Sequence, residues 1–323
     1  MTLRAAVVGL GHLGRHHARL LHQLPGVKLV SICDLLPAKF DQPECPPEVP
    51  RTRDARAAWQ EADLVVVATP TASHAEVALP ALRAGLDVLV EKPLAATASE
   101  GRALLEAARD SGAVLHTGHS ERFNSAYRAV GGRLQDVRFV EGHRLAPFTP
   151  RSLDVDVVLD LMVHDLDLAL HAVRRPVERV EAVGVPVISP HVDIANARLV
   201  FAGGCVANLT ASRVSAKAVR KLRFFDHDAY WSLDFIQREA DVTVLERPAD
   251  GPPAVSQRRE RLEGEPLRLE LEDFVAACAA RRGGPAHLPA GATGEEGMAA
   301  LELALRVREA IALHADRFGP RQP

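Results

Sequence analysis

The amino-acid sequence predicts a two-domain α/β protein, in which a doubly wound parallel sheet precedes an α+β domain with a large, mostly antiparallel, open-faced sheet. A chain of 323 residues exceeds the length at which one hydrophobic core usually stops growing, about 250 to 300 residues. Apolar strand-like runs alternate with helical patterns up to about residue 119, and strand signals then follow one another closely. We therefore expect one domain over residues 1–119 and a second over residues 120–323.

Composition and charge exclude several classes of partner. The net charge of −3 gives no general attraction to nucleic acid or to an anionic membrane. No apolar run approaches the roughly 20 residues of a membrane span, and the N-terminus lacks the pattern of a signal peptide. The four cysteines include no Cys-x-x-Cys pair, which argues against a zinc knuckle or a disulfide framework. We expect a cytoplasmic protein with a small-molecule ligand.

The start of the chain carries a dinucleotide-binding pattern. A buried strand over residues 3–8 runs into a Gly-x-Gly-x-x-Gly loop, and residues 15–23 have helical character. The glycines permit a tight turn and close approach of the backbone to a pyrophosphate, which N–H groups at the helix start can bind. The pattern predicts a cofactor site of the Rossmann type, although a glycine turn without a ligand is the alternative. The binding residues of this loop are expected to be Gly9, Gly11, His12, Leu13 and Gly14.

A carboxylate at the end of the next strand favours NAD over NADP. The strand over residues 28–33 ends at Asp34, which lies 20 residues after Gly14. A carboxylate at this spacing binds the adenosine ribose hydroxyls. Asp34 would repel a 2′-phosphate, and Leu35 follows it rather than an arginine. The sequence therefore predicts NAD as the cofactor.

Two more segments follow strands of the same sheet. Strands over residues 64–68 and 87–90 are followed by Thr69-Pro70-Thr71-Ala72-Ser73-His74 and by Glu91-Lys92-Pro93. Loops at the carboxyl ends of parallel strands line the ligand crevice. Further cofactor-binding residues are therefore expected among Thr69, Pro70, His74, Glu91 and Lys92.

Lys92 is one of only five lysines in the chain. It stands at a strand end, where its amine could reach the nicotinamide half of a cofactor. Unlike arginine, lysine can also lose its proton when a site demands it. A solvated ion pair with Glu91 is the alternative interpretation.

The connections in the first domain have weaker patterns. Residues 35–53 are rich in proline and predict a surface crossover without a complete helix. Asp54 is expected to cap a short helix to residue 60, and Ser99 to cap a helix to residue 108.

The second domain contains an apolar run, residues 155–173, that is interrupted by acidic residues and histidines. Helical spacing places Asp160, His164, Asp167 and His171 on one stripe of an otherwise apolar helix. Burying such groups without partners is costly, so the stripe should face a polar cavity or a satisfied network. A core helix with a hydrogen-bonded histidine remains the alternative.

Strand signals dominate the rest of the second domain. They cover residues 137–144, 180–187, 196–201, 205–212, 221–225, 231–235 and 242–245. In these strands apolar residues lie on both faces, including the face that helices would not cover. We therefore expect a homodimer or homotetramer that associates through the sheet. Residues 120–134 predict a helix, residues 247–266 a flexible excursion, and residues 267–280 and 295–314 two terminal helices.

These motifs together resemble the glucose-fructose oxidoreductase, inositol dehydrogenase and rhizopine-catabolism (Gfo/Idh/MocA) family. The resemblance rests on the glycine loop, Asp34, the segment ending at His74, Glu91-Lys92-Pro93 and Asp160-x-x-x-His164-x-x-Asp167. It implies an N-terminal Rossmann domain, a second domain with a large open sheet, and oligomers formed through that sheet. Met162 departs from the glycine found in many relatives, which puts the shape of the pocket beside the nicotinamide in doubt.

The resemblance implies an NAD-dependent oxidation of a secondary hydroxyl. We assign His164 as the base that takes the hydroxyl proton, since imidazole titrates nearest neutral pH. Lys92, as an ammonium group, would bind the same oxygen, and Asp160 would bind a neighbouring hydroxyl or orient His164.

Within the family, the segments 119–124 and 144–167 look most like the branch that oxidises the 3-hydroxyl of UDP-N-acetylglucosamine. A guanidinium fork matches a diphosphate or a carboxylate, so arginines in or near these segments are candidates to hold the substrate, as is one asparagine. Each arginine could equally be a solvated surface cation. The candidates are Arg122, Asn124, Arg144 and Arg151.

Three alternatives stay open. The first is a dehydrogenase of a free sugar or cyclitol such as inositol. The second is a regulator that senses NAD(H) without turnover, although such a sensor has no chemical need of Lys92 and His164. The third is a metal site, because Asp160 and His164 have i, i+4 ligand spacing, but no third histidine or cysteine completes it. We therefore expect no metal.

Overall fold

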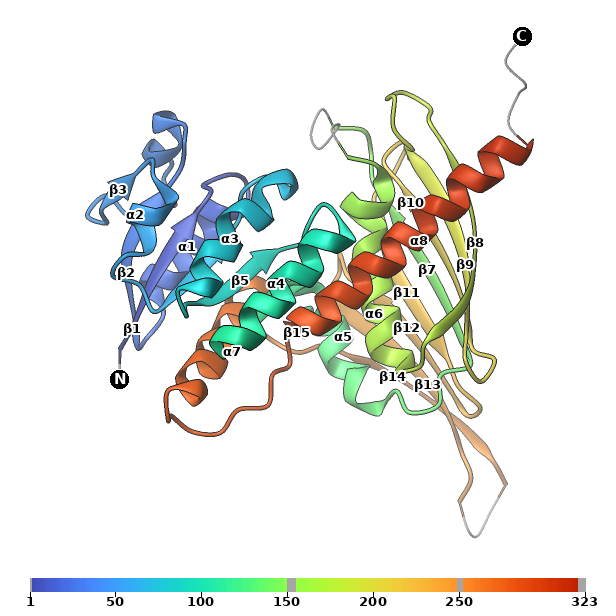
Figure 1. Cartoon of the computed structure of the whole chain (residues 1–323). Helices are drawn as coiled ribbons and strands as arrows, with labels where there is room; N and C mark the ends of the chain where they lie inside the picture. Colours follow the sequence, from blue (N-terminus) through green and yellow to red (C-terminus); the bar gives the residue numbers. More distant parts are fainter. Residues whose placement is uncertain (1, 150–154, 249–251, 319–323) are drawn as a thin grey trace. The chain divides into compact units, whose positions relative to one another are not determined.

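The computed structural model of the chain describes residues 2–149, 155–248 and 252–318. They fall into two compact units, the first containing Met1–Phe123 with Glu265–Met298 and the second Asn124–Gly264 with Ala299–Pro323. Figure 1 follows the chain through both units from its N-terminus to its C-terminus. The division differs from the prediction, which places Glu265–Met298 in the second domain.

The first unit is built on a seven-stranded sheet with the order β15-β6-β5-β4-β1-β2-β3. All neighbouring pairs are parallel except β15 with β6. The order from β3 to β6 is that of a dinucleotide-binding Rossmann fold, which confirms the predicted fold class. The strands are β1 (Leu3–Val8), β2 (Val27–Cys33), β3 (Arg51–Thr52), β4 (Leu64–Val67), β5 (Asp87–Glu91), β6 (Leu115–Gly118) and β15 (Ala292–Thr293).

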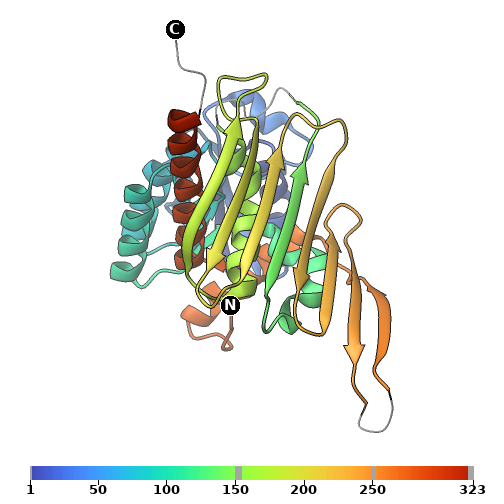
Figure 2. The same cartoon turned by 90° about the vertical axis from the view of Figure 1, so that its right-hand side faces the viewer.

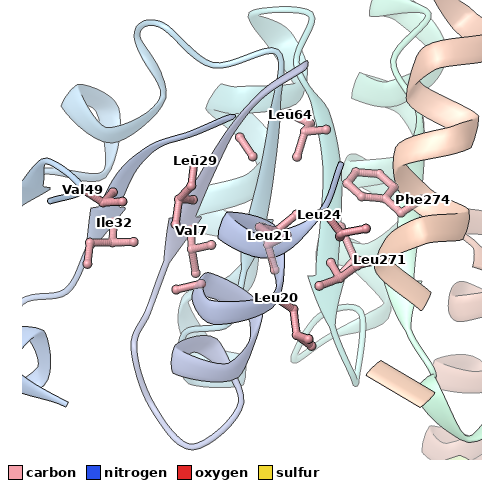
Figure 3. Packing of buried hydrophobic residues seen from close by; sticks show 14 of the residues in the cluster. Val7, Leu20, Leu21, Leu24, Leu29, Ile32, Val49, Leu64, Leu271 and Phe274 are labelled. Carbon is pink, nitrogen blue, oxygen red and sulfur yellow. The ribbon is translucent and has the colours of Figure 1, made fainter. Parts of the chain in front are cut away.

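Helices connect these strands and supply much of the core. They are α1 (Gly14–Gln23), α2 (Ala55–Trp59), α3 (His74–Arg83), α4 (Ala98–Ser111) and α7 (Pro266–Arg281), with short 3₁₀ turns η1 (Pro37–Asp41), η2 (Thr71–Ser73) and η3 (Ser120–Phe123). Leu20 and Leu21 of α1 pack into one hydrophobic cluster with Val7 of β1 (Figure 3). As predicted, Asp54 caps α2 and the crossover between β2 and β3 contains no α-helix. The cap of α4 is Thr97 rather than Ser99, because Thr97 and Glu100 form a capping box.

Helix α7 belongs to the first unit because both its apolar face and its C-terminus are anchored there. Leu271 and Phe274 lie in the same cluster as α1 and β1 (Figure 3). At the end of α7, Arg281 and Arg282 both form ion pairs with the fully buried carboxylate of Asp87, with Arg281 Nε 2.8 Å from Oδ1. A buried carboxylate requires such partners, so this contact ties residues far apart in sequence into one unit.

The second unit contains an eight-stranded sheet with the order β14-β13-β12-β11-β7-β10-β9-β8. The pair β7 and β10 is parallel and the other pairs are antiparallel, which confirms the predicted mostly antiparallel sheet. The strands are β7 (Phe139–Leu145), β8 (Val177–Val185), β9 (Ile194–Phe201), β10 (Val206–Ser212), β11 (Val219–Phe225), β12 (Ala229–Asp234), β13 (Glu239–Glu246) and β14 (Ala254–Glu260).

Helices cover one face of this sheet. They are α5 (Ser125–Val130), a 3₁₀ turn η4 (Gly131–Arg133), a π-helical turn η5 (Val158–Met162), α6 (Val163–Val173) and the C-terminal part of α8 (Gly294–Phe318). Figure 2 shows the sheet from its other side, with α6 behind it. Gly142 of β7 leaves space under the helices for Leu209 and Leu222, since a Cβ at Gly142 would lie 2.6 and 2.9 Å from their side chains.

Two predictions for this unit are wrong in detail. The predicted helix over residues 120–134 is broken, because a new helix begins at Ser125, where the side chain of Asn124 caps it by accepting a bond from Ala126 N. The predicted flexible excursion over residues 247–266 contains strand β14, which pairs with β13. Cross-strand ion pairs hold this polar strand, with Arg259 Nε 2.8 Å from Asp241 Oδ1.

Candidate active site

The three glycines of the glycine loop differ in how closely they pack against the protein. Gly9 has a φ of +92°, and a Cβ there would lie 2.6 Å from the backbone of Ala68. A Cβ at Gly14 would overlap the carbonyl oxygen of Gly9, whereas a Cβ at Gly11 would meet nothing within 4 Å. Gly9 and Gly14 therefore serve packing, and Gly11 leaves open space beside the N-terminal turn of α1. His12 and Leu13 are exposed in this loop.

Asp34 joins the end of β2 to the glycine loop. Its Oδ2 accepts a hydrogen bond from Leu10 N at 2.7 Å, and its Oδ1 accepts one from Leu36 N at 2.8 Å. An ionised carboxylate can accept about four hydrogen bonds, and Asp34 is partly exposed. The side chain can therefore hold the loop and still accept bonds from ribose hydroxyls.

The segment from Thr69 to His74 carries two buried polar groups, a hydroxyl and an imidazole ring. Thr69 Oγ1 is buried and has no hydrogen-bond partner among the described residues, so it fits a contact with a bound cofactor. Pro70 is exposed. His74 is 1% exposed, with Nε2 2.9 Å from Thr69 O and Nδ1 2.9 Å from Pro93 O. Its ring therefore contacts the loops that follow β4 and β5, at Thr69 and at Pro93.

Glu91 and Lys92 stand at the end of β5. Glu91 is buried, and its Oε1 lies 2.7 Å from Nε2 of His17 on α1. Burial acts to raise the pKa of Glu91, but the hydrogen bond and charge of His17 together with the charge of Lys92 outweigh it and lower that pKa. Glu91 is therefore ionised and contacts His17 in the interior of the unit, while Lys92 is partly exposed.

His17 is a residue that the sequence interpretation missed. It lies three residues after Gly14, next to a second histidine, and nothing in the linear pattern distinguishes the two. Only the fold brings α1 against the end of β5, where the fully buried ring of His17 contacts Glu91.

The predicted polar helix of the second unit begins with the π-helical turn η5 and continues as α6. Asp160 and His164 are partly exposed, whereas Met162 and Val163 between them are buried. Residues four apart lie about one turn apart, so Asp160 and His164 project from the same side. Single π turns occur frequently at functional sites. Asp156 fixes the start of the turn by accepting bonds from Val158 N and Leu159 N at 3.0 and 3.1 Å.

The remaining polar residues of this helix are structural. Asp167 is buried, and Nδ1 of His171 lies 2.6 Å from the hydroxyl of Tyr127. Met162, the departure from the family pattern, is fully buried. The four residues of the predicted stripe therefore have different environments. Asp160 and His164 are partly exposed, whereas Asp167 is buried and His171 contacts Tyr127.

The predicted substrate-binding residues have protein partners. Arg122 is buried, with Nη1 3.0 Å from Glu296 Oε1 in the first unit. In the second unit, Arg144 pairs with buried Asp165 at 2.7 Å, and Asn124 Nδ2 donates a bond to Phe235 O at 3.1 Å. Arg151 lies outside the described residues.

Neither a metal-binding cluster nor a membrane-spanning helix occurs among the described residues. No group of three or more His, Cys, Asp or Glu side chains in residues 2–149, 155–248 and 252–318 could hold a metal ion. Among the described helices, none is long and apolar enough to cross a membrane.

The Rossmann sheet, the open glycine loop and the lysine at the end of β5 define a class, the oxidoreductases that bind a nicotinamide cofactor. Comparison with protein families shows which family within this class the chain matches. Residues 3–119 match the oxidoreductase family with an NAD-binding Rossmann fold, and residues 129–225 match the GFO/IDH/MocA C-terminal domain. The protein belongs to the GFO/IDH/MocA oxidoreductase family, which confirms the resemblance and the predicted class of enzyme.

Individual relatives extend this similarity over the whole chain. A UDP-N-acetylglucosamine 3-dehydrogenase of Acidithiobacillus ferrooxidans is 36% identical over 321 residues, covering 96% of this chain and 97% of that protein. A solved structure of that dehydrogenase has a TM-score of 0.84 at 33% identity and covers 97% of this chain and 99% of the other. An inositol 2-dehydrogenase of Rhizobium meliloti is 32% identical over 182 residues, or 52% of this chain and 54% of that protein.

Proposed function

We propose that the protein oxidises a secondary hydroxyl of a nucleotide sugar, UDP-N-acetylglucosamine at C3, with NAD as hydride acceptor. The observation that carries the proposal is the 36% identity to a UDP-N-acetylglucosamine 3-dehydrogenase over 96% of the chain. Similarity to an inositol 2-dehydrogenase covers 52% of the chain, which supports a free sugar or cyclitol less well.

The proposed roles follow from residue chemistry. NAD, when bound, supplies the hydride acceptor. His164 takes the proton of the substrate hydroxyl, and Lys92 donates a hydrogen bond to the same oxygen as negative charge develops on it. Asp160, one turn before His164, binds a neighbouring hydroxyl or orients the imidazole. The partial exposure of all three side chains supports these roles.

Asp34 supports NAD over NADP. Its carboxylate is partly exposed at the end of β2 and fixed by the N–H groups of Leu10 and Leu36. A carboxylate fixed there accepts hydrogen bonds from the ribose hydroxyls and repels a 2′-phosphate. The glycine loop and the buried hydroxyl of Thr69 would contact the rest of the cofactor.

We also propose association of copies through the open sheet. The rings of Phe139, Phe225 and Tyr230 form a row across β7, β11 and β12, with centroids 5.4 and 4.9 Å apart. All three are partly exposed on the face opposite the helices, as an interface requires. Four free, buried cysteines support a reducing compartment such as the cytoplasm.

Turnover of a defined panel tests the activity. Purified protein with NAD is mixed separately with UDP-N-acetylglucosamine, UDP-N-acetylgalactosamine, free N-acetylglucosamine and myo-inositol, and reduced nicotinamide is measured. We expect turnover of UDP-N-acetylglucosamine and competition by UDP. Turnover of myo-inositol without competition by UDP would favour the cyclitol dehydrogenase, and no turnover of any compound would favour a sensor of NAD(H).

A further inference from the structure

The residue before Lys92 is held by a buried histidine from the glycine-loop helix. His17 Nε2 lies 2.7 Å from Glu91 Oε1, and the His17 side chain is fully buried. Because Glu91 is ionised and accepts only, Nε2 of His17 donates this bond. Glu91 Oε2 accepts a second bond, at 3.2 Å, from the backbone N–H of Lys92 itself. Both oxygens of Glu91 are thereby used to fix the chain where the lysine begins.

The neighbouring strand leaves room for this carboxylate only because it carries a glycine. A Cβ at Gly118 of β6 would lie 3.0 Å from both Cδ and Oε2 of Glu91. This is closer than an ordinary van der Waals contact, so a larger residue at this position would press on the carboxylate. The position of Glu91 is thus defined on three sides, by α1, by β6 and by its own turn.

The residue after Lys92 is held by a second buried histidine. His74 Nδ1 lies 2.9 Å from Pro93 O, and Nε2 lies 2.9 Å from Thr69 O. Both partners are main-chain oxygens, and the neutral ring that burial favours carries a single N–H, so His74 donates to one of them and contacts the other. Both ring nitrogens thus face the protein, which supports an indirect role for His74 beside the cofactor.

We propose that His17 and His74 are positioning residues that fix Lys92 from its two sides, through Glu91 and Pro93. This inference rests on the proposed function, in which Lys92 binds the reacting oxygen. A lysine side chain has high rotamer entropy, so the placement of its amine depends on a rigid main chain at its base. A displacement of about 1 Å at a reacting group can cost about 100-fold in rate.

The small number of lysines makes the position of Lys92 directly measurable without a cofactor. Reductive methylation with ¹³C-formaldehyde labels the five lysines together with the N-terminal amine and keeps their charge, and Lys92→Arg assigns one NMR signal. We expect His17→Leu and His74→Leu to move the Lys92 signal by more than its line width, with the other four signals unchanged. His17→Gln, which retains a donor for Glu91, should restore the original position.

A matched control comes from the last turn of the same helix. His22 Nε2 lies 2.9 Å from Glu48 Oε1, and both side chains are exposed, at 40% and 61%. His22→Leu removes a histidine–carboxylate contact without touching the turn at Lys92, so the Lys92 signal should stay in place. Circular dichroism confirms that each variant is folded, and the conservative His17→Gln keeps the test valid if His17→Leu does not fold.

Kinetics separate this inference from the proposed function. We expect His17→Leu and His74→Leu to lower kcat about 10- to 100-fold while the KM for NAD changes less than about threefold. An unmoved Lys92 signal with a raised KM for NAD would overturn the inference and assign these histidines to the cofactor loops. Full turnover by Lys92→Met would instead overturn the proposed role of Lys92, whatever the NMR result.

Discussion

Arg144 of β7 and Asp165 of α6 form a buried ion pair. Arg144 Nη2 and Nε lie 2.7 and 3.1 Å from the same oxygen, Asp165 Oδ1, and both side chains are 4% exposed. The guanidinium also lies 5.8 Å from the centre of the Phe235 ring. This arrangement neutralises the charge of Arg144 inside the second unit.

Arg144→Met should therefore destabilise the protein. Removing Arg144 takes the guanidinium away from a buried carboxylate, and breaking a buried pair costs about 3–5 kcal/mol, whereas removing both charges is often nearly neutral. We expect Arg144→Met with Asp165→Leu to recover most of the loss, as measured by urea denaturation. Unchanged stability of Arg144→Met with a raised KM for the sugar would instead support the substrate-binding role that the sequence predicts.

Two of the loop glycines, Gly9 and Gly11, should separate folding from ligand binding. Gly9→Ala places a Cβ against the backbone of Ala68 at a φ of +92°, so we expect a loss of at least about 1–2 kcal/mol in stability. Gly11→Ala meets no protein atom within 4 Å and should leave the melting temperature unchanged. Calorimetric titration should nevertheless show NAD affinity weakened about tenfold or more. Full NAD affinity in Gly11→Ala would mean that the pyrophosphate does not approach this glycine.

Asp34→Asn should shift the cofactor preference. The amide oxygen can still accept the bond from Leu10 N, so the substitution should cost the loop only the exposed bond from Leu36 N. Loss of the negative charge should lower kcat/KM for NAD about tenfold and raise the ratio of NADP to NAD turnover. An unchanged ratio would show that Asp34 acts on the loop alone, and Asp54→Asn at the cap of α2 is a suitable control.

Stability should fall as the pH drops below about 6.5. Burial lowers the pKa of His74 and of His116 from the ordinary value of 6.5, because it disfavours the charged ring. The unfolded chain then binds more protons than the folded one, so stability is complete above pH 6.5 and is lost as the pH falls toward the lowered values. Urea denaturation at pH 7.5 and 5.5 measures this loss, which should be smaller in His116→Gln. Equal stability of the native protein at the two pH values would contradict the expectation.

The sequence by itself determined the fold class and nominated the candidate site residues. The glycine loop, Asp34 and the strand-end segments are local patterns, because each lies within a few residues of the strand that positions it. Periodicity likewise predicted the antiparallel sheet and the helix that carries Asp160 and His164. Local backbone rules, such as the need of tight turns for glycine, suffice for these features.

Only the tertiary structure decided which polar residues are partners of one another. Asp87 with Arg282, Glu91 with His17, and Arg144 with Asp165 are separated by 195, 74 and 21 residues. No short-range pattern encodes such pairs, since they form when the sheets bring distant segments together. Burial then makes each pair obligatory, because a charge removed from water must be compensated where it lies. For this reason the sequence could nominate Arg144 for a ligand and overlook His17, while the fold gives both of them protein partners.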